Sequence, residues 1–191
     1  MGKIEKGKAG YLSEKKRNNL IYTIIAFAVV VAVFVAGLLI FKSRNNYMTL
    51  VSVVLVLPAA KIAVGYFILL PHHSCSGDLV KRLNQEAPQL VKKYDLIISN
   101  TKKPVGVQAC IITEKCICVL TDEMKTDQKF FEKSVFDFLK NEKLNVSVSM
   151  YTDEDTFLKR VQNLSRNFDA ENKEHTDRMS WNAEGLMHMC I

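Results

Sequence analysis

Two long apolar segments dominate the pattern of hydrophobic and polar positions: Leu20–Phe41 and Tyr47–Leu70. They contain no Asp or Glu, and only residues 42–46 separate them. Each segment exceeds the roughly 18 apolar residues that mark a membrane-spanning helix, and a small soluble domain could not bury two such helices on every side. The pattern therefore predicts transmembrane helices at 20–41 and 47–70, joined by a short connector as a helical hairpin.

Small side chains recur at four-residue spacing in both apolar segments. Ala28, Ala32 and Ala36 share one face of the first helix, and Ala59 and Ala63 share one face of the second. Small residues allow two membrane helices to approach closely. We expect these faces to pack the two helices against each other, because the short connector already holds them together. The alternative is that one of these faces forms a homodimer.

Lys61 is the one charged residue inside the second apolar segment, and it follows Pro58 closely. A lysine at the bilayer centre costs roughly 2.5–3.5 kcal/mol on insertion scales, which the many Leu, Ile, Val and Phe residues offset at roughly 0.3–0.6 kcal/mol each. Neither segment contains an acid that could pair with it. Lys61 therefore either pairs with an acidic residue on a membrane protein partner or extends its ammonium group towards the membrane surface.

The net charge of +6 is divided unevenly along the chain. Residues 1–19 carry +4, residues 20–71 carry +3 and residues 72–191 carry −1. The positive charge would therefore meet the anionic headgroups of a lipid bilayer, and the balanced soluble part is not expected to bind nucleic acid. Because basic residues remain on the cytoplasmic side, we expect a multi-pass plasma-membrane protein. Its basic arm, 1–19, is expected to be disordered at first and to become helical near Ser13. The arm and the C-terminal part are cytoplasmic, and the connector 42–46 is external.

Residues 78–191 show alternating helical and strand patterns. Helical spacing of apolar residues predicts helices at 78–93, 127–141 and 153–168, and β-branched or alternating apolar residues predict strands at 94–99, 105–112, 116–121 and 144–150. Residues 78–168 thus form an α/β (α+β) domain of order αβββαβα with a mixed sheet. Its last two strands are parallel, because a right-handed helical crossover joins them. Residues 169–180 are interpreted as a polar linker, and 181–191 as a short apolar tail that adds either an edge strand or a helix.

The order αβββαβ resembles the core of the restriction-endonuclease-like nucleases. The resemblance implies a carboxylate on the second strand and an acid-x-lysine pair on the third, which together hold a divalent metal. Neither strand of this chain carries an acid. Glu114 and Lys115 are adjacent in a turn, and Asp95 is alone on the first strand. The resemblance therefore implies an inactive nuclease-like domain. The whole layout also resembles uncharacterised bacterial two-helix membrane proteins with a small cytoplasmic α/β domain.

Candidate chemistry is confined to scattered histidines and cysteines. His72, His73 and Cys75 lie just after the hairpin, and Cys75 is also a candidate for lipidation. Cys116 and Cys118 could complete a four-ligand zinc site, but paired residues on one strand face more often pack in a core. His175 and His188 have no spacing that ties them to a cysteine. We therefore expect no catalytic residue, metal or cofactor.

These patterns favour a membrane-anchored, non-enzymatic interaction or sensory module whose ligand the sequence does not identify. Five cysteines form no complete set of disulfides, and the cytoplasm would keep them reduced. One alternative is a membrane-tethered nuclease-like domain that is inactive. The other is an accessory subunit of a membrane complex, with Lys61 as its contact to the partner.

Overall fold

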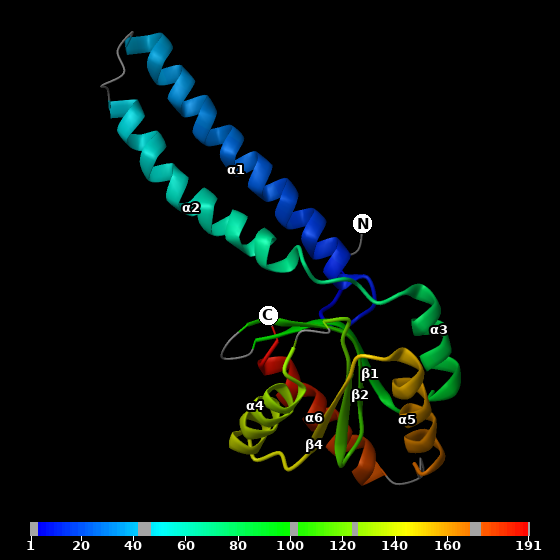
Figure 1. Ribbon diagram of the computed structural model, residues 1–191. Coiled ribbons are helices and arrows are strands. Elements are labelled where there is room, and N and C mark those ends of the chain that lie inside the picture. The colour runs from blue at the N-terminus through cyan, green and yellow to red at the C-terminus, as the bar shows by residue number, and fades with distance from the viewer. Residues whose placement is uncertain (1–3, 42–46, 100–102, 124–125, 169–172, 191) are drawn as a thin grey trace. The chain divides into compact units, whose positions relative to one another are not determined.

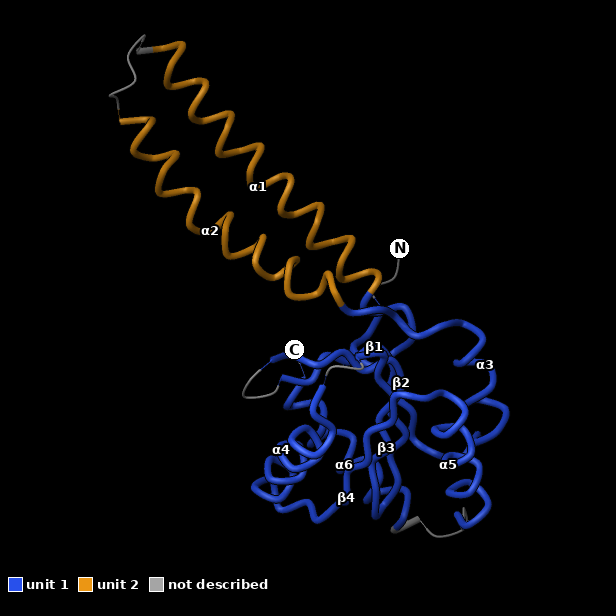
Figure 2. The backbone as a smooth tube through the Cα atoms, viewed as in Figure 1, with its two compact units in different colours: residues 1–12, 72–191 blue, residues 13–71 orange. Residues whose placement is uncertain are grey.

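The computed structural model describes residues 4–41, 47–99, 103–123, 126–168 and 173–190. The chain divides into two compact units, which Figure 2 shows in separate colours. Unit 2 comprises residues 13–71 and unit 1 comprises residues 1–12 and 72–191. The predicted connector at 42–46 lies outside the described residues.

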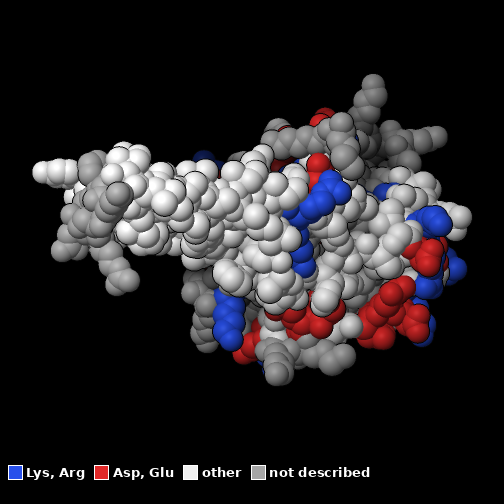
Figure 3. All heavy atoms as spheres, turned by 90° about the horizontal axis from the view of Figure 1, so that it is seen from above, with Lys and Arg blue, Asp and Glu red and all other residues white. Residues whose placement is uncertain are grey.

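Unit 2 consists of two long helices that run alongside each other, α1 (Tyr11–Phe41) and α2 (Tyr47–Leu69) (Figure 1). Both are long and apolar enough to span a membrane. Most of their large apolar side chains are exposed, and Figure 3 shows an almost uncharged surface on this unit. At its base, Lys16 Nζ donates to the Leu70 carbonyl oxygen at 3.0 Å. The apolar segments thus form the two expected helices, although α1 begins well before Leu20.

Unit 1 is built on a four-stranded mixed sheet in the order β1-β2-β3-β4. Its strands are β1 (Val91–Ile98), β2 (Val105–Ile112), β3 (Cys116–Leu120) and β4 (Ser147–Tyr151). The first three are antiparallel neighbours, and β3 and β4 are parallel. The crossover between β3 and β4 contains helix α4 (Gln128–Asn141). The predicted mixed sheet with a parallel final pair is confirmed.

Helices cover both faces of this sheet (Figure 1). On one face, α4 and α6 (Lys173–His188) enclose a core that includes Phe131, Val135 and Leu186. On the other face, α3 (Gly77–Glu86) and α5 (Glu154–Arg166) enclose a second core that includes Leu83 and Phe157. Side-chain oxygens of Ser76, Asp127 and Asp153 accept hydrogen bonds from the first turns of α3, α4 and α5. These caps explain where the three helices begin.

The predicted boundary between the first helix and the first strand was wrong. Helix α3 ends at Glu86 and β1 begins at Val91, whereas the sequence pattern extended the helix to residue 93. Pro88 explains the early end, because proline disfavours a helical conformation in the residue before it. The last strand is also shorter than expected, since it begins at Ser147 instead of residue 144.

The predicted linker at 169–180 was also wrong, because α6 already begins at Lys173. Met179 of this helix is buried in the second core, and Ala183 and Leu186 are buried in the first. Just beyond the helix, Cys190 forms an isolated antiparallel bridge with Ile98. The last described residues therefore belong to the folded domain and complete both of its cores.

The N-terminal arm is not disordered in residues 4–12, which pack as part of unit 1. The Gly7 carbonyl oxygen accepts from Tyr94 N at 2.9 Å, and Lys6 Nζ donates to the Cys190 carbonyl oxygen at 2.6 Å. Gly7 and Gly10 have φ values of 88° and 85°. Glycine adopts this left-handed region readily, so these two residues allow the arm to turn before α1.

Two substitutions in α6 test whether this helix is structural. Leu186→Ala removes a fully buried side chain and should lower the free energy of unfolding by about 2–5 kcal/mol. Trp181→Ala removes a side chain that is 66% exposed and should change it by no more than about 0.5 kcal/mol. Denaturant unfolding of the full chain in detergent measures both. Equal effects of the two substitutions would contradict the packing of α6.

Candidate functional site

A buried carboxylate holds both chain segments that lead to the long helices. The Asp95 side chain accepts from Cys75 N at 2.7 Å with one oxygen, and from Gly10 N at 2.7 Å and Leu12 N at 3.4 Å with the other. Asp95 is 1% exposed. We call Asp95 and these three donors the Asp95 clamp. It joins the end of the arm to the segment after α2, both within unit 1.

Asp95 reaches this position through an unusual backbone conformation. Its φ is 53°, a region in which aspartate is several-fold enriched among non-glycine residues. Strand pairing runs to Tyr94–Ala109 and resumes at Leu96–Val107. Tyr94 packs in the second core and Leu96 in the first. Burial raises the pKa of Asp95, and the N–H donors of Cys75, Gly10 and Leu12 oppose that rise.

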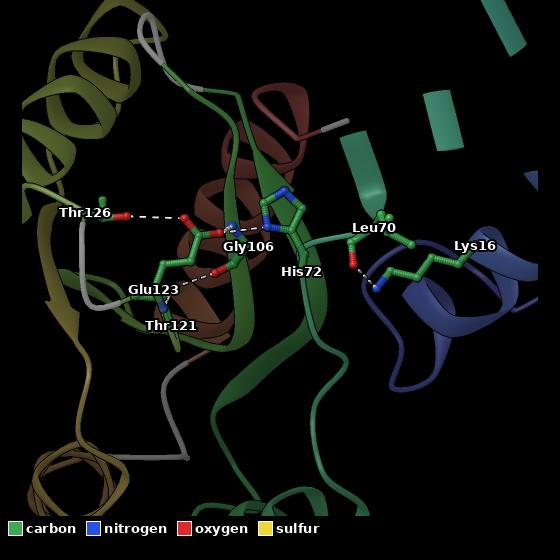
Figure 4. A network of polar contacts seen from close by, with 7 residues as sticks. All are labelled: Lys16, Leu70, His72, Gly106, Thr121, Glu123 and Thr126. Atoms are coloured by element: carbon green, nitrogen blue, oxygen red, sulfur yellow. Dashed lines mark hydrogen bonds and ion pairs between the residues drawn. The ribbon is translucent and has the colours of Figure 1, made fainter. Parts of the chain in front are cut away.

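A second contact fixes His72, the third residue after α2. The His72 ring Nδ1 lies 2.7 Å from Glu123 Oε1, which also accepts from Gly106 N at 2.8 Å (Figure 4). Thr121 Oγ1 donates to the Gly106 carbonyl oxygen and accepts from Glu123 N. A Cβ atom on Gly106 would lie 2.8–3.0 Å from three atoms of His72. Gly106 is therefore needed for the close approach of His72.

A further group of polar side chains in unit 1 lines a pocket of about 470 Å³. The turn before β3, the helices α5 and α6 and the first residue of β4 contribute its walls. Its lining residues are Thr113, Glu114, Lys115, Cys116, Ser147, Arg160, Leu164, Asn167, Phe168 and His175. We call this cavity the thiol pocket, because the sulfur-bearing residue Cys116 lines it.

Cys116 occupies an environment that favours its thiolate. A hydrogen bond from Cys118, a second from Thr113 and the charge of Arg160 outweigh burial and lower the pKa of Cys116 to about 6. Thr113 Oγ1 lies 3.2 Å from Cys116 Sγ. The same pairing raises the pKa of the Cys118 thiol. Residues two apart on a strand face the same side, which brings the two sulfurs together.

The lining of the pocket also holds a carboxylate, that of Glu114, with two basic partners. Glu114 pairs with His175 Nδ1, and its other oxygen accepts from Arg178 Nη1 at 2.8 Å. Desolvation acts against ionisation of Glu114. The hydrogen bond and charge of His175 and the charges of Arg178 and Lys115 outweigh it, so the pKa of Glu114 is lowered. Asn182 Nδ2 donates to the Thr113 carbonyl oxygen at 2.9 Å and thereby ties α6 to the turn.

The structure separates the residues that the sequence suggested as zinc ligands. His72 contacts Glu123, His73 is exposed, and Cys75 belongs to the Asp95 clamp. Cys116 and Cys118 pack in the second core, as expected. In the described ranges, no three His, Cys, Asp or Glu side chains are grouped as metal ligands.

The candidate residues of the hairpin lie in two different environments. Ala59 and Ala63 are buried within unit 2, whereas the three small residues on the expected α1 face, Ala28, Ala32 and Ala36, are exposed. Lys61 lines an open cavity of about 540 Å³ with Asn19, Tyr22 and Gly65. Within the described part of the chain, Lys61 forms none of the ion pairs.

Sequence reasoning placed Glu114 in a turn and His175 in a linker, and it connected neither with a cysteine. These two residues are 61 positions apart, so no local motif could join them. Arg160 lies in the helix predicted at 153–168, and nothing in the sequence distinguished it from the other polar residues of that helix. Asp95 carried no signal either, because most of its partners are backbone N–H groups, which every residue type except proline has. No known protein family, curated protein or solved structure matches this chain.

Substitution of Asp95 tests the Asp95 clamp. Asp95→Ala leaves three backbone N–H groups without their acceptor, at about 1–3 kcal/mol for each buried group. We expect a loss of about 3 kcal/mol or more in the free energy of unfolding, together with faster proteolysis within residues 4–12. Asp95→Asn keeps one acceptor oxygen and tolerates the positive φ, so it should retain part of the stability. If both variants unfold like the wild type, the Asp95 clamp contributes nothing.

Proposed function

We propose that the protein is a membrane-anchored, non-enzymatic sensory module. In this proposal α1 and α2 span the plasma membrane, unit 1 and both chain ends are cytoplasmic, and unit 1 is the part that senses. The length and apolar composition of the two helices support the anchor. The six basic residues of the arm support its orientation, because they would face anionic headgroups on the cytoplasmic side.

The observation that carries the proposal is the Asp95 clamp. One carboxylate on β1 binds backbone N–H groups from the segment before α1 and from the segment after α2. A domain that was only tethered to the membrane would need covalent connections to the helices. It would not need a buried carboxylate that binds the backbone of both connecting segments. A displacement of β1 changes both connections at once, which is what a domain that reports its state to membrane helices requires.

In this proposal, the thiol pocket is the site at which unit 1 binds or reacts with the molecule that it senses. It lies at Thr113, beyond one end of β2, while Gly106 near the other end contacts His72. Seven residues of strand separate the two positions, about 23 Å at 3.3 Å per residue. Strand β2 pairs with β1 along this length. A continuous set of strand contacts therefore joins the pocket to the Asp95 clamp.

The nuclease-like alternative is supported by strand order, but the carboxylates near the sheet have other partners. Asp95 accepts three backbone N–H groups, Glu114 pairs with His175 and Arg178, and Glu123 pairs with His72. The accessory-subunit alternative is supported by Lys61, whose cavity in unit 2 also presents the side chains of Asn19 and Tyr22. A membrane partner that supplies a carboxylate there is compatible with a sensory module.

The orientation predicts the accessibility of two introduced cysteines. Ser43→Cys in the connector should react with a membrane-impermeant maleimide in intact cells. Glu142→Cys, at an exposed position of unit 1, should react only after the cells are permeabilised. The wild type, with its five native cysteines, gives the background. The reverse pattern of labelling would overturn the orientation, and labelling of neither variant in permeabilised membranes would show that the reagent failed.

Communication between pocket and clamp can be measured by hydrogen exchange in detergent. Glu114→Gln weakens the contacts of Glu114 with His175 and Arg178 and should accelerate exchange in peptides covering residues 4–12 and 72–76. We expect about two-fold or more, the equivalent of about 0.5 kcal/mol of long-range coupling. Lys159→Gln, an exposed change on α5, is the control. Unchanged exchange in both peptides would overturn the sensory function.

A further inference from the structure

We propose that Cys116 is a modification site for hydroperoxides, so that oxidation in the thiol pocket is the signal that unit 1 detects. This inference rests on the proposed sensory function for its biological meaning. The chemistry of the site is separate from that function and can be tested alone. The inference rests on geometry: Cys116, Cys118 and Arg160 lie together at a cavity beside β3.

The cavity gives a small molecule access to a sulfur that is otherwise enclosed. Cys116 is only 7% exposed, yet it lines the pocket of about 470 Å³. Leu164 and Phe168 provide an apolar wall, and Arg160 provides N–H donors and a positive charge on the side of the sulfur. This combination suits a molecule with an apolar body and a polar, reactive oxygen end. An organic hydroperoxide has that form.

The other four cysteines lack such surroundings. Burial raises the pKa of Cys75 to about 12, with the charges of Asp95 and Glu154 acting in the same direction. It raises the pKa of Cys190 to about 11 against the charge of Lys6, and it raises that of Cys110 well above its ordinary value. The lowered pKa of Cys116 favours its thiolate, which is the reactive form of a cysteine. The reaction is therefore specific to one sulfur.

Charged and titratable groups face Cys116 from several elements. Cys118 lies on the same strand and Cys110 on β2, and Tyr151 of β4 and Arg160 of α5 interact with the same pair of thiols. Glu114, Lys115 and His175 complete the lining, with Glu114 already neutralised by His175 and Arg178. Arg160 is thus the cation that acts directly on the Cys116 thiolate.

The reaction balances with the hydroperoxide as oxidant. The Cys116 thiolate attacks the terminal oxygen, an S–O bond forms and the O–O bond breaks. Sulfur is oxidised to a sulfenic acid, and the peroxide is reduced to an alkoxide that takes a proton from solvent and leaves as the alcohol. The positive charge of Arg160 stabilises the negative charge that develops on the departing oxygen.

The sulfenic acid should persist long enough to be trapped. Two residues along a strand are about 6.6–6.8 Å apart, and disulfides join Cα atoms about 4.4–6.8 Å apart. A disulfide between Cys116 and Cys118 would therefore lie at the limit of the allowed geometry. Cys118 instead donates its hydrogen bond to the reacting sulfur, and a thiol from outside the domain would reduce the product.

The test uses the full chain in detergent, treated with cumene hydroperoxide and dimedone and analysed by peptide mass spectrometry. We expect a dimedone adduct on Cys116 whose rate of formation rises with a midpoint near pH 6. No comparable adduct should form on Cys75, the half-buried cysteine with raised pKa. Adducts on Cys75 and Cys116 at equal rates, or none on Cys116, would overturn the site.

Two variants at neighbouring positions of α5 distinguish the effect of the Arg160 charge in the thiol pocket from the general effect of removing a positive charge. Arg160→Met should shift the midpoint upward by about one pH unit or more, the effect of removing a nearby opposite charge. Lys159→Met removes the same charge from a residue outside the pocket and should leave the midpoint unchanged. Equal shifts in both would overturn the role of Arg160. Oxidation of Cys116 that leaves hydrogen exchange at the Asp95 clamp unchanged would overturn the sensory function and leave the modification site standing.

Discussion

The structure of unit 1 depends on one buried carboxylate that accepts hydrogen bonds from the backbone of two distant segments. Asp95 brings together three N–H groups from two segments that lie more than sixty residues apart in the chain. A buried carboxylate without such donors would be strongly destabilising. Each of the three donors would in turn lose its acceptor if Asp95 were absent. The carboxylate and the two segments therefore stabilise one another.

The same residue also explains why β1 lacks simple alternation. The left-handed backbone at Asp95 moves the following apolar residues to the other face of the sheet, so Tyr94 and Leu96 belong to different cores. Because β1 contributes side chains to both cores, few of its positions can hold a polar side chain. Strand β2 is buried along nearly all of its length for the same reason, since helices cover both faces.

Sequence reasoning succeeded where the apolar pattern is local and failed where partners are distant. The long apolar segments, the bounds of β2 and the parallel β3–β4 pair followed from periodicity and connection rules. The first half of helix α6 was missed, because residues 173–178 are polar and Met179 was not recognised as part of one apolar stripe with Leu186. A helix was one of the two alternatives for residues 181–191. The Asp95 clamp and the thiol pocket could not be predicted, because both join residues from separate elements through contacts that leave no spacing in the sequence.

The contact between Lys6 and Cys190 has a consequence for the order in which the protein is made. These residues are 184 positions apart, and their hydrogen bond joins the arm to the segment that follows α6. During translation, the apolar helices leave the ribosome long before Cys190 exists. Residues 4–12 therefore cannot complete their packing on unit 1 until the segment after α6 has been made. A ribosome that stalls before α6 would leave unit 1 with both of its cores open, because Met179 of this helix packs in one and Leu186 in the other.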